Sequence, residues 1–153
     1  MAHSVFNIAK GRVGELYNRV VSNDPANSAF ILIPLETSGL EADATLVDMD
    51  TVTQVLAGTT NEQTTMGRKT LTDAQLATMP APDDVNNRYD FSLPNVVWAA
   101  ATGNAVSKIL VAYDSDTTGG TDANLIPLTM FDFIVTPSGT DITATGAVFY
   151  RAS

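Results

Sequence analysis

The sequence contains no cysteine and a single histidine among its 153 residues. The absence of cysteine excludes thiol catalysis, zinc–thiolate sites, iron–sulfur clusters and disulfide bonds. His3 lies in a terminal segment, so neither a Ser-His-Asp triad nor a histidine–metal arrangement is expected. The G-x-S-x-G, P-loop and dinucleotide-binding glycine motifs are also missing. The sequence therefore predicts a protein that is not an enzyme and that uses no cofactor.

Basic side chains are scarce as well. The chain has 8 Lys and Arg against 17 Asp and Glu, which gives a formal net charge of -9. This charge would be repelled by phosphate backbones, so nucleic acid is not an expected partner. No stretch approaches the ~18 to 20 apolar residues that cross a bilayer, and no leader-like segment opens the chain. We expect a soluble protein without membrane contact, made in the cytoplasm.

The carboxylates are concentrated in one segment. From Asp24 to Gly67 there is no Lys or Arg, whereas seven acidic residues occur there: Asp24, Glu36, Glu41, Asp43, Asp48, Asp50 and Glu62. This pattern predicts an acidic surface, which either keeps the protein soluble or docks on a basic partner.

Near the N-terminus, apolar residues recur at helical spacing. Val13, Leu16, Tyr17 and Val20 fall on one face of a helix predicted over residues 7–21, and Pro25 prevents its continuation. We expect an N-terminal helical segment, residues 1–22, followed by a single β-rich domain, residues 23–153.

The rest of the chain is typical of β structure. Residues 28–35 form a nearly continuous apolar run, as in a strand that is covered on both faces or lies at an oligomer interface. Four later runs, residues 96–101, 105–114, 125–135 and 141–151, are separated by turns rich in Gly, Asp and Thr. We expect a mainly β fold, a β-sandwich or jelly-roll-like body with an N-terminal helix and one or two short helices.

The apolar helix face and the apolar strand are the predicted contacts between copies in a homo-oligomer, a dimer or a trimer. The expected interface residues are Ile8, Val13, Leu16, Tyr17, Val20, Phe30 and Leu32.

One loop has the opening pattern of a calcium site. Residues 114–119 match the D-x-D-x-x-G opening of a calcium loop, in which Asp114, Asp116 and Asp122 fall at positions 1, 3 and 9. Leu125 stands where an EF-hand requires a bidentate Glu, so the EF-hand interpretation fails. The remaining alternatives are a looser calcium site and a turn that connects two strands.

Four short phrases carry a resemblance to a known group of proteins. They are FNIAKGR at residues 6–12, NDPANS at 23–28, LTDA at 71–74 and IPLTMFDF at 126–133. In these phrases the chain resembles small virion structural proteins of tailed bacteriophages, most of all the capsid decoration or cement proteins. The resemblance implies a non-enzymatic protein on the outer surface of the head, with the major capsid protein as its partner. A tail, neck or fibre component and a glycan-binding β-sandwich module are the alternatives.

Overall fold

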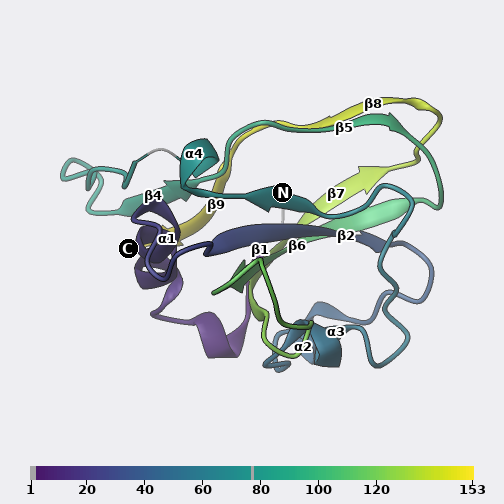
Figure 1. Cartoon of the computed structure of the whole chain (residues 1–153), viewed down its shortest axis with the longest axis horizontal. Helices are drawn as coiled ribbons and strands as arrows, with labels where there is room; N and C mark the ends of the chain where they lie inside the picture. Colours follow the sequence, from purple (N-terminus) through teal and green to yellow (C-terminus); the bar gives the residue numbers. More distant parts are fainter. Residues whose placement is uncertain (1–2, 77) are drawn as a thin grey trace.

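The computed structural model describes residues 3–76 and 78–153, and its fold is mainly β with a sandwich-like body, as the sequence predicted (Figure 1). Its strands are β1 (His3–Val5), β2 (Ala29–Glu36), β3 (Lys69–Leu71), β4 (Tyr89–Ser92), β5 (Val96–Ala101), β6 (Val106–Asp114), β7 (Ile126–Val135), β8 (Thr140–Ala144) and β9 (Val148–Ala152). Its helices are α1 (Val13–Val21), α2 (Asp43–Leu46), α3 (Val52–Val55) and α4 (Asp73–Leu76), with a 3-10 turn, η1 (Asn7–Ala9). Among the described residues, none of the helices has the length and apolar character that crossing a bilayer requires.

A five-stranded antiparallel sheet organises the molecule, with the strand order β1-β7-β6-β2-β3. The apolar run of the sequence forms β2, which pairs with β6 on one side and β3 on the other. Every residue of β2 from Ala29 to Leu35 is buried. A strand covered on both faces needs no alternation of polar and apolar residues, which accounts for its continuous apolar sequence.

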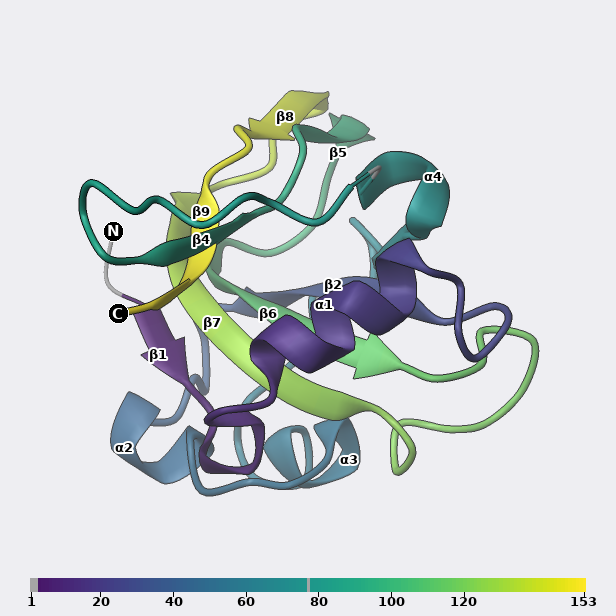
Figure 2. The ribbon, with the colours of Figure 1, turned by 90° about the vertical axis from the view of Figure 1, so that its left-hand side faces the viewer.

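Two antiparallel ribbons, β4–β9 and β5–β8, complete the β structure. The β5–β8 ribbon lies on one side of the five-stranded sheet, and α2 and α3 lie on the other (Figures 1 and 2). Trp98 of β5 packs toward Phe133 of β7, with ring centroids 6.0 Å apart, and its Nε1 donates to the Gly67 carbonyl at 2.9 Å. The body is therefore layered, with the core between the main sheet and the elements on its two sides.

Helix α1 is joined to this core by an aromatic cluster. The Tyr17 ring lies 5.8 Å from Phe30 of β2, 5.3 Å from Phe91 of β4 and 6.2 Å from Phe149 of β9. Phe149 in turn lies 5.6 Å from Phe30. This cluster of Tyr17, Phe30, Phe91 and Phe149 connects the helix, the main sheet and a ribbon in one packed unit.

The structure corrects the predicted separation of an N-terminal segment, residues 1–22. Within its described part, β1 pairs with β7, Phe6 is fully buried and α1 packs in the core. The helix was predicted over residues 7–21, but α1 begins at Val13, because Gly11 takes a positive φ of 79° that a helix cannot continue through. The chain folds around one core from its N-terminal strand onward.

The predicted interface residues are also corrected. Val13, Leu16, Tyr17, Val20, Phe30 and Leu32 are buried inside a single chain, and only Ile8 is partly buried at the edge of the core. The ribbons that help cover these residues come from distant parts of the sequence. The local pattern therefore showed that one face of the helix and the apolar strand must be buried, but it did not show which segments cover them. The six buried residues do not provide an exposed surface for a second copy.

Replacing Phe149 by alanine should lower the free energy of unfolding by about 3–5 kcal/mol, because its ring is 2% exposed and contacts Tyr17 and Phe30. Urea denaturation followed by circular dichroism measures the change. Ile134→Ala serves as the control, since Ile134 is 87% exposed and its loss should change stability by less than about 0.5 kcal/mol. Equal effects of the two substitutions would contradict the described core.

Thr129 of β7 is fully buried, and its Oγ1 has no hydrogen-bond partner among the described residues. Because an unpaired buried hydroxyl is costly, the nearly isosteric Thr129→Val should stabilise the fold by about 1–2 kcal/mol. The same change at the exposed Thr70 of β3 should be nearly neutral. Thermal unfolding of both variants decides the point, and a destabilised Thr129→Val protein would mean that the hydroxyl is hydrogen-bonded in solution.

Candidate functional site

His3 lies on β1 opposite Phe131 of β7, and the two rings are 6.0 Å apart. Partial burial of the imidazole lowers the pKa of His3 below its ordinary value. The sequence places His3 in a terminal segment; its side chain is exposed, and the residue belongs to a paired strand. Its ring contact with Phe131 is apolar, so His3 is a strand residue beside an aromatic side chain.

The structure does not assemble the predicted calcium loop from Asp114, Asp116 and Asp122. The Asp116 carboxylate accepts hydrogen bonds from the backbone N–H of Thr118 at 3.0 Å and from its hydroxyl at 2.6 Å. The Asp114 carboxylate accepts from the Asp116 N–H at 3.0 Å. These are the contacts of a turn, and no three His, Asp or Glu side chains in the described ranges are grouped to hold a metal ion.

Asp122 instead belongs to an ion-pair cluster with Arg68 and Glu62. Arg68 Nη1 lies 2.6 Å from Asp122 Oδ1, and Nη2 lies 2.9 Å from Oδ2. On its other side, Arg68 binds both Glu62 oxygens at 2.8 and 2.6 Å. The hydrogen bonds to Asp122 and then to Glu62 raise the pKa of Arg68, and the bond from Arg68 lowers the pKa of Asp122. This cluster connects the loop before β7 to the segment before β3, so its role is structural.

A second cation, Lys108 of β6, lies between two carboxylates. Its Nζ is 2.6 Å from Asp132 of β7 and 3.2 Å from Asp43 of α2. Asp43 also accepts a hydrogen bond from the Ser4 hydroxyl at 2.9 Å. The cluster therefore links α2, β1, β6 and β7, and it joins the main sheet to the short helices on one side.

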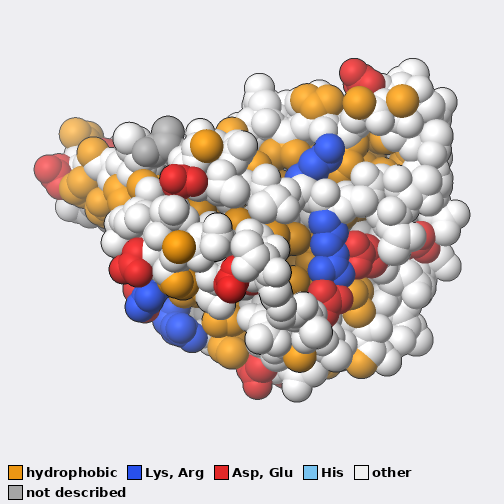
Figure 3. All heavy atoms as spheres, viewed as in Figure 1, with side chains coloured by type: hydrophobic (Ala, Val, Ile, Leu, Met, Phe, Trp, Pro, Cys, Tyr) orange, Lys and Arg blue, Asp and Glu red, His pale blue; other side chains and the backbone are white. Residues whose placement is uncertain are grey.

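The acidic segment, residues 24–67, is largely engaged within the chain. Asp43 and Glu62 pair with the cations described above, and three further carboxylates accept side-chain hydrogen bonds: Glu36 from Asn104, Glu41 from Thr60 and Asp48 from Asn7. Figure 3 shows Lys and Arg side chains directly beside Asp and Glu side chains on the face in view. The negative charges of this segment are thus partly neutralised by Lys and Arg side chains that lie outside it in the sequence but close to it in space.

A hairpin that the sequence did not single out as a site projects at one end of the molecule. Residues 83–88 turn back on themselves through an antiparallel bridge between Asp83 and Arg88, with Asp83 N–H donating to the Arg88 carbonyl at 2.9 Å. In Figure 1 this loop lies beyond β4, at the far left. Val85 at its tip is 89% exposed. We call residues 83–88 the tip hairpin.

A network of charges holds the tip hairpin in place. Arg88 Nε lies 3.0 Å from Asp83 Oδ2 and 3.2 Å from Asp90 Oδ2, and Arg151 of β9 binds Asp90 with Nη2 at 2.9 Å. A hydrogen bond from the Asn86 side chain lowers the pKa of Asp83. A hydrogen bond from Arg151 lowers the pKa of Asp90. The network fixes the base of the hairpin to the β4–β9 ribbon and leaves the apolar tip in solvent.

Replacing Asp122 by asparagine should lower the free energy of unfolding at pH 7 by about 1–2 kcal/mol, because the Asp122 and Arg68 side chains are 34% and 28% exposed and thus only partly desolvated. The folded state lowers the pKa of Asp122, so its stabilising effect is present above the unfolded pKa of about 3.9 and is lost as pH falls below it. Urea denaturation between pH 7 and pH 2.5 should show wild type and variant converging in acid. Asp84→Asn, an equal charge change at an exposed site, is the control and should change the free energy of unfolding at pH 7 by less than about 0.5 kcal/mol.

The chain was compared with known proteins in three ways. No protein-family model, no curated protein and no solved structure matches it.

Proposed function

We propose that the chain is a non-enzymatic structural protein of a tailed-phage virion, which binds the major capsid protein and cements the outer surface of the head. The proposal starts from the resemblance of four short segments to virion proteins of this kind. The mainly β body agrees with the fold that the resemblance implies. In addition, Asp122, a candidate calcium ligand in the sequence, forms an ion pair with Arg68 within the chain.

The single observation that carries the proposal is the tip hairpin. It presents one apolar side chain, Val85, on a turn whose base is held by the charges of Asp83, Arg88 and Asp90. Because the base is already ordered, little conformational entropy remains to be lost when the tip binds. An exposed apolar side chain that enters a complementary hollow on a neighbour is removed from water, which favours the contact. The hairpin therefore suits attachment to another protein.

Charge and repetition favour the exterior of a shell. A protein with a net charge of -9 would be repelled by packaged DNA inside the shell, whereas on the outer surface it does not face the DNA. A shell presents many identical sites, so a weak contact at each site adds up when a homo-oligomer, a dimer or a trimer, bridges several subunits. In this way each bound copy stabilises the assembled state over the dissociated one.

The attachment experiment replaces Val85 by serine. Removing a contact of this size should weaken binding to purified expanded shells by about tenfold or more, measured as occupancy in a sedimentation assay. Val97→Ser on β5 is the matched control, because Val97 is 46% exposed and receives the same chemical change. Electron microscopy of the parent particle tests the location.

Density on the outer head surface, together with selective loss of binding in Val85→Ser, would support the proposal. Density at the tail or neck would replace it with the alternative of a tail or neck component, and absence of the protein from the particle would reject both. If the shell binds Val85→Ser and wild-type protein equally well, the tip hairpin is not the attachment element.

A further inference from the structure

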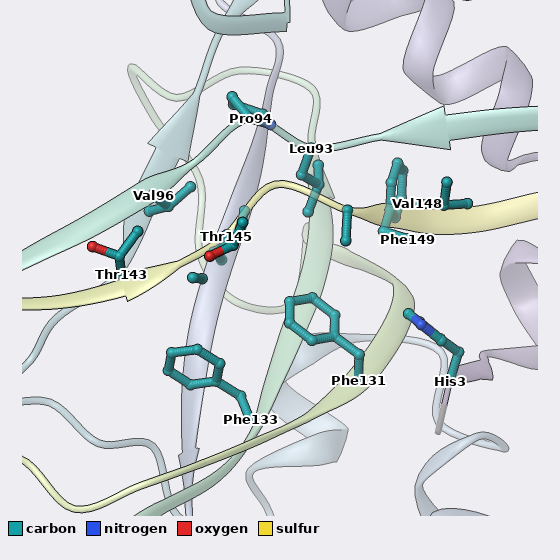
Figure 4. Close-up of a pocket in the computed structure, with 13 residues that line it drawn as sticks. His3, Leu93, Pro94, Val96, Phe131, Phe133, Thr143, Thr145, Val148 and Phe149 are labelled. Carbon is teal, nitrogen blue, oxygen red and sulfur yellow. The ribbon is translucent and has the colours of Figure 1, made fainter. Parts of the chain in front are cut away.

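A cavity of about 220 Å³ lies between the five-stranded main sheet and the two ribbons, β4–β9 and β5–β8. Figure 4 shows Phe131 and Phe133 of β7 on one side of it and the β8–β9 connection on the other. His3 lies at one end and Thr143 at the opposite end. The cavity is separate from the ion-pair clusters and from the tip hairpin, since none of their residues lines it.

The lining is aromatic and aliphatic, with a few neutral polar groups. Phe131, Phe133 and Phe149 contribute phenyl rings, and Leu32 and Val96 contribute aliphatic surface. The hydrogen-bonding side chains of the lining are the imidazole of His3 and the hydroxyls of Thr143 and Thr145. No lining residue is Asp, Glu, Lys or Arg, so the site offers no ion pair to a charged ligand.

The wall formed by the β8–β9 connection is fixed and made of small residues. Leu93 N–H donates to the Ala147 carbonyl at 3.1 Å, and Gly146 N–H donates to Asn95 Oδ1 at 2.6 Å. A Cβ at Gly146 would lie 2.5 Å from the Leu93 carbonyl oxygen, so the close approach of the two segments requires glycine. Ala144 and Ala147 then leave space that larger side chains would occupy.

We propose that this cavity binds a small neutral aromatic molecule that carries one hydrogen-bonding group. An apolar cavity of roughly 150 Å³ is large enough to bind benzene, so the present cavity accommodates a ring with a further substituent or a second fused ring. Its three phenyl rings favour an aromatic guest through edge and offset contacts. His3, Thr143 or Thr145 pairs with the polar group, while the apolar lining and the net charge of -9 disfavour an anion.

A native cavity supports this inference physically. The cavity opens to solvent beside the exposed residues His3, Thr143 and Thr145, so part of its apolar lining is in contact with water. A ligand that covers this apolar surface binds the folded state alone and therefore stabilises it. The inference goes beyond the proposed virion role and does not depend on it, because it concerns a site inside one chain.

The test uses indole as the probe and the methyl resonances of the wild-type protein as the readout. Indole at millimolar concentration or below should shift the methyl signals of Leu32, Val96 and Val148, which line the cavity, in a saturable way. The signals of Leu46, Val52 and Val55, which belong to α2 and α3 and do not line it, should not move. Benzoate, an anion of similar size, should bind at least about tenfold more weakly.

Ala144→Leu provides the matched loss-of-binding variant, because the larger side chain fills the cavity. It should weaken indole binding by about tenfold or more, whereas the same change at the exposed Ala99 of β5 should leave binding unchanged. The wild-type titration stands independently of whether Ala144→Leu folds.

Three outcomes would overturn the proposal. The first is the absence of any methyl shift with indole, and the second is tighter binding of the flexible aliphatic probe 1-octanol. The third is movement of the cavity methyl signals with protein concentration in the absence of a probe, which would mean that a second copy of the chain fills the space. None of these results bears on attachment to a shell.

Discussion

The packing of Tyr17 against Phe30 and Phe149 is the interaction on which the rest of the structure depends. It brings together a helix from the start of the chain, a strand of the main sheet and a strand from the end of the chain. Aromatic rings bury large areas, so this contact removes extensive apolar surface of α1, β2 and β9 from water. Without it, α1 and the β4–β9 ribbon would each expose an apolar face.

The fold class could be predicted from the sequence because its signal is local. Residues 28–35 showed by their continuous apolar character that they form a doubly covered strand, and β2 is that strand. The short helices α2, α3 and α4 have four residues each, too few for a helical period to be distinctive, and the sequence predicted only one or two of them. What covers a given face depends on segments far away, and this is why the buried face of α1 was mistaken for an interface.

Contacts between distant residues also explain what the sequence did not reveal about the candidate sites. Arg68 and Asp122 are 54 positions apart, and no spacing rule connects a cation to a carboxylate over that distance. The loop at Asp114 carried a metal-like pattern because calcium sites and tight turns both use Asp and Gly. The tip hairpin is indicated in the sequence only by the Asp and Asn residues around Val85, which favour a turn. The cavity has no sequence pattern, because its walls come from segments that are far apart in the chain.

The strand order of the main sheet has a consequence for how this protein is made. β1 pairs with β7, so after it has left the ribosome β1 waits for the residues near position 130 before it can pair. β2 likewise waits for β6, and during that interval its apolar residues have no partner strand on that side. Pairing over such sequence distances is slow, and unpaired apolar strands aggregate readily. The apolar surface of β2 therefore stays without its partner strand during synthesis until the residues of β6 have emerged, and the main sheet is completed only when β7 follows.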